Sequence, residues 1–212
     1  MTTNGQAHFI TLEGGEGAGK STQAKRLAAQ LQAKGITTVL TREPGGSPGA
    51  EEIRKLLVEG EPGRWDAMTE ALLMFAARAD HVARTIRPAL AAHKWVIGDR
   101  FTDSTYVYQG AGRGLRAKKI AVLEDVVLGG LEPDLTLILD LPVQDGLKRA
   151  EARRSNETRF EKFDMAFHQS LREGFREIAK ANPVRCVLVD ATGPEEQVAE
   201  RIWREVQARF GL

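Results

Sequence analysis

Eight consecutive residues carry the clearest chemical signal, because Gly14-Gly15-Glu16-Gly17-Ala18-Gly19-Lys20-Ser21 matches the pattern G-x-x-x-x-G-K-[ST]. In such a loop, successive backbone N–H groups surround a phosphate, and the glycines let the chain approach it without a Cβ clash. Lys20 would reach the β- and γ-phosphates, and the Ser21 hydroxyl would ligate Mg²⁺. The residues expected to bind ATP are therefore Gly14, Gly15, Glu16, Gly17, Ala18, Gly19, Lys20, Ser21 and Thr22.

The segments on either side of this loop have the required character. Residues 8–13 read as a short apolar strand, and apolar residues recur with helical spacing at Ala24, Leu27, Ala28 and Leu31. The positive N-terminal end of that helix would add to the anion site. These flanks disfavour the alternative, a glycine-rich turn that binds nothing.

An acidic and a basic residue end another apolar run. Asp99 is the last of residues 94–99, which read as a buried strand, and Arg100 follows it. A carboxylate in this position can hold Mg²⁺ beside the loop hydroxyl, so we predict a metal site at Ser21 and Asp99. Arg100 can bind phosphate oxygens with two parallel hydrogen bonds. The alternatives are a helix N-cap for Asp99 and a surface ion pair for Arg100.

The phosphate loop contains no cation before Lys20, so further positive charge for phosphoryl transfer must come from elsewhere. Arg153-Arg154 and Arg159 flank a short polar segment that could close over ATP as a lid and exclude water. The alternative for that segment is a solvated basic turn. Arg78 lies off the apolar stripe of its predicted helix, where an exposed salt bridge is the alternative.

Strand and helix patterns alternate along the whole chain. The expected strands cover residues 8–13, 37–40, 94–99, 135–140 and 184–190, with helices between and after them. Among these helices, one starts near Asp66 and is kinked or ended by Pro88, and another covers 161–181. This order predicts an α/β class, with a three-layer α/β/α P-loop NTPase fold, a five-stranded parallel sheet and a small mobile lid. We expect one domain over residues 1–212, with the lid insert near 153–160.

Composition narrows the possible functions. A net charge of +1 gives no indication of a nucleic-acid surface, and no apolar stretch approaches the length of a membrane span. The four histidines have no metal-ligand spacing, and the one cysteine, Cys186, cannot form a disulfide within the chain. With no signal-peptide pattern at the N-terminus, these features predict a cytoplasmic protein without nucleic-acid or membrane partners.

Several motifs in a fixed order resemble the bacterial thymidylate kinase (dTMP kinase) family of P-loop nucleoside monophosphate kinases. The resemblance covers essentially the whole chain. It is carried by Phe9 to Thr22, Thr41 to Gly46, Trp95 to Phe101, Ser104-Thr105, Tyr108-Gln109-Gly110, Pro133 to Thr136, Leu139-Asp140 and Arg159-Phe160-Glu161.

The resemblance implies transfer of the γ-phosphoryl group of ATP to dTMP, giving dTDP for dTTP biosynthesis, with Mg²⁺ and in a homodimer. It implies that Glu16 faces the 3′-hydroxyl of dTMP, that Arg42 contacts its phosphate and that Tyr108 crowds the ribose 2′ position. The implied catalytic residues are Lys20, Arg100, Arg153 and Arg159. The implied dTMP-binding residues are Glu16, Arg42, Phe75, Arg78, Arg100, Ser104, Thr105, Tyr108 and Gln109, with Arg78 and Gln109 near the base.

The sequence departs from the family pattern at two places. The aromatic residue that stacks on thymine in many relatives corresponds to Met74, and Phe75 is one residue away. The lid lacks the usual Arg-Gly and Asp-Arg pairs, which leaves its catalytic arginine open. Two other functions are considered: another small-acceptor P-loop kinase, and a nucleotide switch or ATPase without a small-molecule acceptor.

Overall fold

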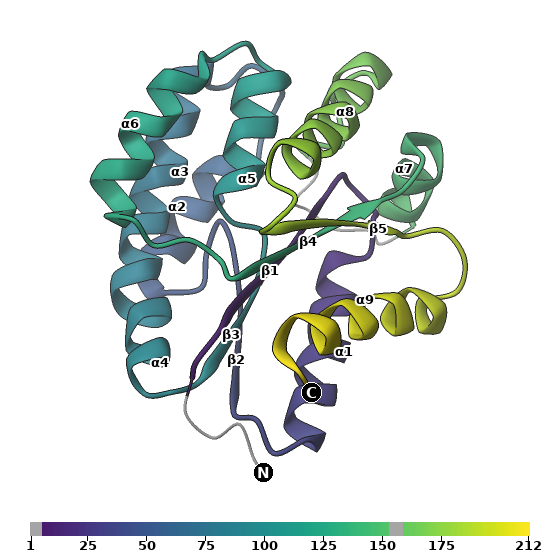
Figure 1. Cartoon of the computed structure of the whole chain (residues 1–212). Helices are drawn as coiled ribbons and strands as arrows, with labels where there is room; N and C mark the ends of the chain where they lie inside the picture. The colour runs from purple at the N-terminus through teal and green to yellow at the C-terminus, as the bar shows by residue number, and fades with distance from the viewer. Residues whose placement is uncertain (1–5, 153–158) are drawn as a thin grey trace.

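A parallel five-stranded sheet forms the centre of the molecule (Figure 1). The computed structural model describes residues 6–152 and 159–212. The strands are β1 (Phe9–Gly14), β2 (Thr38–Arg42), β3 (Trp95–Asp99), β4 (Leu135–Asp140) and β5 (Cys186–Asp190). Their order is β2-β3-β1-β4-β5, so the strand that leads into the phosphate loop is central. The predicted strands and the parallel sheet are confirmed.

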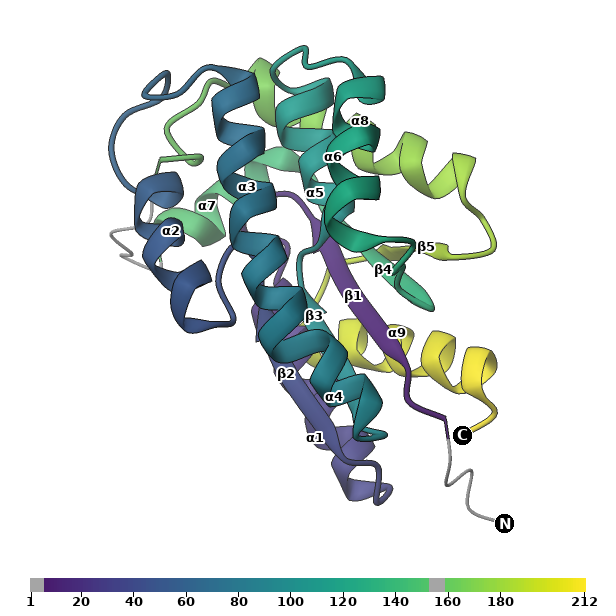
Figure 2. The same ribbon diagram turned by 90° about the vertical axis from the view of Figure 1, so that its left-hand side faces the viewer.

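Helices cover both faces of the sheet, which confirms the three-layer arrangement (Figures 1 and 2). One face carries α1 (Lys20–Ala33) and α9 (Glu195–Phe210), which pack against each other. The other helical elements are α2 (Pro48–Val58), α3 (Ala67–His81), α4 (Arg87–Ala91), α5 (Thr102–Thr105), α6 (Ala117–Leu128), α7 (Val143–Glu151) and α8 (Met165–Ala181), with π-helical turns at Val82–Ile86 and Tyr106–Ala111.

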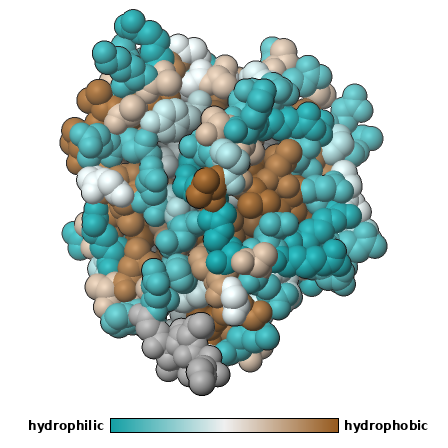
Figure 3. Space-filling view, in the orientation of Figure 1, coloured by the Kyte–Doolittle hydropathy of each residue, from teal (hydrophilic) through white to brown (hydrophobic). Residues whose placement is uncertain are grey.

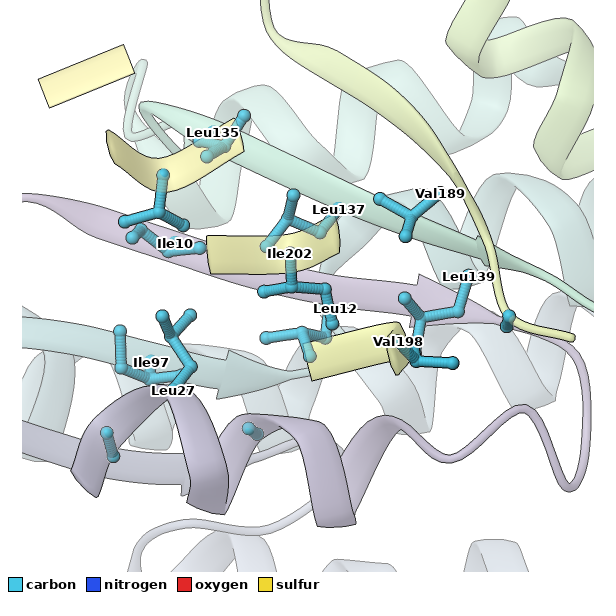
Figure 4. Packing of buried hydrophobic residues seen from close by; sticks show 14 of the residues in the cluster. Ile10, Leu12, Leu27, Ile97, Leu135, Leu137, Leu139, Val189, Val198 and Ile202 are labelled. Carbon is cyan, nitrogen blue, oxygen red and sulfur yellow. The ribbon is translucent and has the colours of Figure 1, made fainter. Parts of the chain in front are cut away.

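The pleat of β1 divides its side chains between two cores. Ile10 and Leu12 pack with Leu27 of α1 and Ile202 of α9 (Figure 4). Phe9 points to the opposite face and joins the cluster of α4 and the end of α6. Since successive strand residues face opposite sides, Thr11 and Glu13 also lie on the side of Phe9, where both are fully buried. That face therefore holds polar groups directly beneath the carboxyl edge of the sheet.

One helix boundary differs from the sequence expectations, and one alternative at Pro88 is excluded. The helix does not end at Pro88, because helical structure continues to Ala91. Before the proline, the Arg87 N–H bonds the Val82 carbonyl five residues back, so the hydrogen-bond register has shifted where Pro88 lacks an N–H. The helix expected from residue 161 begins instead at Met165, because the Asp164 side chain caps it by accepting from the Phe167 N–H at 2.8 Å.

No helix in the described ranges is both long and apolar enough to cross a bilayer. The greater part of the predicted lid insert, residues 153–158, lies outside the described residues, and so do Arg153 and Arg154. The division into one domain with such an insert stays a prediction.

Candidate active site

A cavity of about 820 Å³ opens at the carboxyl edge of the sheet. The phosphate loop and the start of α1 form one side of it, and α3 with the π-helical turn 106–111 forms the other. Parallel α/β sheets collect ligands at this edge because the strands end there and the loops diverge. The predicted residues that line it are Glu16, Gly17, Ala18, Gly19, Lys20, Ser21, Thr22, Arg42, Arg78, Asp99, Arg100, Ser104, Thr105, Tyr108 and Gln109.

The phosphate loop connects β1 to α1 in a conformation that depends on glycine. Gly17 and Gly19 have φ angles of 67° and 92°, in the left-handed region. A Cβ on Gly17 would lie 1.8 Å from the Gly146 carbonyl oxygen of α7. Gly14 and Gly15 form the start of the loop and do not line the cavity. Their place is behind the anion site, where the Gly15 carbonyl accepts a hydrogen bond from Lys20 Nζ at 2.7 Å.

Lys20 is buried at the floor of the cavity. Burial, together with the nearby charge of Arg100, lowers the pKa of its ammonium group to about 8, although Glu16 and Asp99 oppose that change. Its charge therefore remains largely in place at neutral pH, next to the loop that would hold the phosphates.

Ser21 and Asp99 meet at the carboxyl end of β3. The Ser21 hydroxyl donates a hydrogen bond to Asp99 Oδ2. Hydroxyl and carboxylate oxygens are hard ligands of the kind that Mg²⁺ takes alongside phosphate oxygens. Across residues 6–152 and 159–212, no three His, Cys, Asp or Glu side chains are grouped to hold a metal ion. The donor set therefore fits an ion shared with a nucleotide rather than a metal held by protein alone.

Arg100 ties the phosphate loop to the opposite wall. Its guanidinium donates to the Gly14 carbonyl at 3.0 Å, to Glu16 Oε1 at 3.1 Å, to the Tyr108 hydroxyl at 2.8 Å and to Ser104 Oγ at 3.0 Å. Its own backbone is left-handed, with φ of 72°. A non-glycine residue in that region is strained, and the four hydrogen bonds offset the cost.

Glu16 is held as a carboxylate by its neighbours. Burial alone would raise its pKa, but Arg100, Lys20 and the Tyr108 hydroxyl outweigh burial and lower it to about 2. Tyr108 donates to Glu16 Oε1 at 2.7 Å, and burial raises the pKa of its phenol well above the usual value. The cavity therefore contains an anionic acceptor beside a cation and a neutral hydroxyl.

Arg78 projects from α3 into the same cavity and is almost fully buried. Its Nε donates to Glu43 Oε2 at 2.7 Å, and Nη2 donates to the Phe101 carbonyl and to Thr105 Oγ1. Glu43 Oε1 lies 2.9 Å from His81 Nδ1. Within the part of the chain that the structure describes, Arg78 Nη1 has no hydrogen-bond partner. A buried guanidinium with an unused donor is suited to a ligand carbonyl.

Gln109 supplies a complementary group from the π-helical turn. Its Nε2 donates to Glu70 Oε1 at 2.8 Å, and both side chains are fully buried. Its Oε1 finds no hydrogen-bond partner among the described residues. Two residues that line the cavity thus have a buried polar atom without a partner among the described residues, a donor on Arg78 and an acceptor on Gln109.

Phe75 does not line the cavity, contrary to the expectation that it binds substrate. Phe75 is 2% exposed and packs beneath the Arg78 guanidinium. The distance from Arg78 Cζ to the centroid of the Phe75 ring is 4.7 Å. Met74 lines the cavity instead. Met74 and Arg78 are four residues apart and share a helix face, whereas Phe75 belongs to the apolar stripe.

Arg159 is also away from the cavity lining, which does not favour its predicted catalytic role. Its guanidinium is fully buried against Glu70 Oε2, and it donates to the Leu57 carbonyl at 2.9 Å and the Glu61 carbonyl at 3.3 Å. These groups are on α2, α3 and the loop between them. Phe160 and Glu161, the next residues, do line the cavity.

Several residues near the site were not among those predicted from the sequence. Glu43 and His81 support Arg78, and Glu70 supports Gln109. Arg149 of α7 lines the cavity near the phosphate loop. Glu70 is four residues before Met74 and eight before Arg78, so its position on the face of α3 with Arg78 was a usable signal. Arg149 gave none, because it is one of several polar residues on an exposed helix.

Comparison with known proteins gives concordant results along the chain. Residues 12–202 match the family model described as thymidylate kinase. The chain is 56% identical over 207 residues to the thymidylate kinase of Caulobacter vibrioides, covering 98% of this chain and 99% of that protein. It is 55% identical over 195 residues to the thymidylate kinase of Rhizorhabdus wittichii, covering 92% of this chain and 94% of that protein.

A solved structure agrees with the fold. The crystal structure of thymidylate kinase from Ehrlichia chaffeensis superposes with a TM-score of 0.77 at 35% sequence identity. The match covers 96% of this chain and all of that chain.

Proposed function

The chain belongs to the thymidylate kinase family and phosphorylates dTMP to dTDP with ATP, and we propose that the cavity at the carboxyl edge of the sheet holds both nucleotides. The observation that carries this proposal is the position of Arg100. It contacts the phosphate loop through the Gly14 carbonyl and the opposite wall through Tyr108. A cation in that position lies between a donor on one side and an acceptor on the other.

Transfer needs charge stabilisation more than covalent chemistry. A dTMP phosphate oxygen attacks the γ-phosphorus of ATP, ADP leaves, and negative charge spreads over the transferring oxygens. Lys20 and Arg100 are held by hydrogen bonds to carbonyls of the phosphate loop, so they would stabilise that charge as preorganised cations. Ser21 and Asp99 would hold Mg²⁺, which neutralises phosphate charge when bound.

The opposite wall suits thymine. Thymine presents a carbonyl acceptor at O4 and an N–H donor at N3, and these match the free donor of Arg78 and the free acceptor of Gln109. Cytosine presents the reverse pair, which would leave both protein groups unpaired, so the site should reject cytosine strongly. Met74 rather than Phe75 would meet the base.

The sugar and phosphate of dTMP would occupy the middle of the cavity. Glu16 would accept from the 3′-hydroxyl, and Tyr108 would crowd the 2′ position, in line with their hydrogen bond to each other. Arg42 would contact the dTMP phosphate from the end of β2, where it also pairs with Glu51 at 3.0 Å. Ser104 and Thr105 would act by holding Arg100 and Arg78.

Two arginines are candidates for a further cation on the ATP side. Arg153 stays a prediction, since it lies outside the described residues. Arg149, which lines the cavity from α7, is a further candidate. For Arg159, the buried contacts with Glu70 favour anchoring of the segment after the lid.

The test compares Arg78→Met with Arg84→Met, an exposed arginine just beyond α3. Loss of a charged hydrogen-bond donor costs ~1.5–3 kcal/mol, so the KM for dTMP should rise about 10- to 100-fold in Arg78→Met. The KM for ATP should change little, and Arg84→Met should resemble the parent. ADP release with dTMP, dUMP, dCMP, dGMP and dAMP gives the substrate order. A parent enzyme that prefers dCMP or a purine nucleotide would contradict the assignment of the cavity.

A homodimer and a cytoplasmic location also belong to the proposal. Val122 and Val126 of α6 and Leu72 of α3 are exposed apolar side chains. Figure 3 has hydrophobic patches at its left edge, where Figure 1 has α6. Burial of this surface in a second copy would remove it from water. A cytoplasmic location agrees with the use of ATP and dTMP.

A further inference from the structure

Glu70 is a fully buried carboxylate that does not itself line the cavity. Its Oε1 accepts from Gln109 Nε2 at 2.8 Å. Its Oε2 pairs with Arg113 Nη1 at 3.0 Å and with the Arg159 guanidinium. Both oxygens are therefore used, each by groups from other segments of the chain. Burial of a carboxylate is costly even when it is paired, so we expect Glu70 to have a role that accounts for its burial.

The two ends of the Gln109 amide have different partners available. A carboxylate accepts hydrogen bonds and donates none, so only the Nε2 end of the amide can face Glu70 Oε1. The reverse orientation would set two oxygen atoms against each other in a buried site and would leave both unpaired. Because Nε2 is engaged, the polar atom that Gln109 has left for a ligand is Oε1, an acceptor.

We propose that Glu70 is a positioning residue that sets nucleobase selectivity by fixing the amide orientation of Gln109. This inference rests on the proposed placement of dTMP beside Arg78 and Gln109. Free rotation of the amide would let Gln109 offer either a donor or an acceptor at N3 and would weaken the choice between thymine and cytosine. Arg113 and Arg159 supply the cations that make burial of the carboxylate tolerable.

Glu70→Gln tests the orientation directly. The oxygen of the new carboxamide should stay with Arg113 and Arg159, so its N–H group faces Gln109 and favours the reversed amide orientation, in which Gln109 Oε1 is the acceptor of that bond. The ratio of kcat/KM for dTMP to kcat/KM for dCMP should fall at least about 10-fold, with Arg78 still providing part of the discrimination. A purely structural glutamate would lower kcat/KM for the two substrates together and leave the ratio unchanged.

Two further variants separate orientation from charge. Arg113→Met removes one cation but keeps the hydrogen bond between Glu70 Oε1 and Gln109, so the ratio should stay at the parent value. Glu70→Gln combined with Arg113→Met removes one charge of each sign, so it restores the charge balance of the group if the single variant folds poorly. The ratio in this double variant should fall as in Glu70→Gln.

The outcomes distinguish the inference from the proposed function. An unchanged ratio in folded Glu70→Gln or in the double variant overturns the inference, while a parent enzyme that prefers dTMP leaves the function intact. If neither variant folds, a ¹⁵N–¹³C coupling across the hydrogen bond from Gln109 Nε2 to Glu70 decides the matter in the parent protein. It should persist when dTMP is added, and its loss with transfer of the Gln109 N–H to dTMP overturns the inference.

Discussion

At the scale of single residues, the site is built from charged groups whose partners are other groups of the same chain. Lys20 bonds a carbonyl of its own loop, and Arg100 bonds four acceptors. Each of these cations is buried together with the anion or dipole that stabilises it. Substitution of one such cation is informative, because it leaves a known acceptor without its hydrogen-bond donor.

Lys20→Ala should lower kcat by at least ~100-fold, by analogy with the loss of one preorganised charge donor. The reason is that its ammonium group is the cation of the phosphate loop itself. Lys25→Ala, on the exposed side of α1, should retain the parent rate. Steady-state ADP release at saturating ATP and dTMP measures both variants. Near-parental turnover in Lys20→Ala would mean that ATP does not use this loop.

Glu13 provides a test of pH dependence. Burial, with a contribution from Asp103, raises its pKa from 4.5 to about 7, although it accepts from the Phe101 N–H at 2.7 Å and the Ser104 hydroxyl at 2.6 Å. The native state therefore holds a proton that the unfolded state has lost. The stability from this group is complete below pH 4.5 and is lost as the pH rises through about 7.

Glu13→Gln should abolish that loss, which is on the order of 2–3 kcal/mol at ~1.4 kcal/mol per pKa unit. Urea unfolding at pH 5 and pH 8 measures it. From pH 5 to pH 8, the free energy of unfolding should decrease more in the parent than in the variant. The difference between the two decreases should equal the loss assigned to Glu13. Exposed Glu177→Gln should follow the parent. A variant that keeps the full decrease would show that Glu13 is ionised over this range.

At the scale of elements, α7 fixes the phosphate loop through a glycine contact. A Cβ on Gly146 would lie 2.3 Å from the Glu16 carbonyl oxygen. Alanine normally stabilises a helix interior by ~1 kcal/mol relative to glycine. Here the collision with backbone should reverse the sign.

Gly146→Ala should therefore lower the free energy of unfolding by about 1–3 kcal/mol and raise the KM for ATP. Thermal unfolding and initial rates over a range of ATP concentrations test the two effects. Gln144→Ala, at an exposed position of α7, serves as the control and should be neutral or slightly stabilising. A more stable Gly146→Ala protein would refute the proposed contact.

The elements themselves could be predicted because their signals are local. The apolar runs at 94–99 and 135–140 marked buried strands, and helical spacing marked 117–128. The exact limits of the helices could not be predicted where a single hydrogen bond determines them. The cap by Asp164 and the π-helical turn before Pro88 both depend on backbone geometry that periodicity does not report.

The site was only partly predictable for the same reason. The phosphate loop is a contiguous motif, and Asp99-Arg100 follows a recognisable strand. The partners of Arg78 and Gln109 come from positions 43 and 70, which are distant in sequence and meet only in the folded chain. The buried position of Arg159 was not predicted for the same reason, since its partner Glu70 is 89 residues away in the sequence.

At the scale of the whole molecule, the exposed apolar side chains of α6 define the expected dimer surface. Val122 is 58% exposed and Val126 is 78% exposed, and they are four residues apart on one helix face. In a two-fold interface each substitution occurs twice. Glu at both positions should therefore give a monomer, as measured by light scattering after gel filtration. A parent protein that is already monomeric would exclude the proposed dimer.

The support of Arg78 and Gln109 by Glu43 and Glu70 has a kinetic consequence. These contacts join groups of the chain to one another and involve no atom of the donor nucleotide, so we expect the pocket for the acceptor nucleotide not to depend on the donor. Either substrate should then be able to bind first, in a random-order mechanism. Calorimetric titration with dTMP should give similar dissociation constants, within about threefold, with and without a non-hydrolysable ATP analogue. An enzyme that binds dTMP only after the analogue would require an obligatory order and an acceptor pocket that the donor completes.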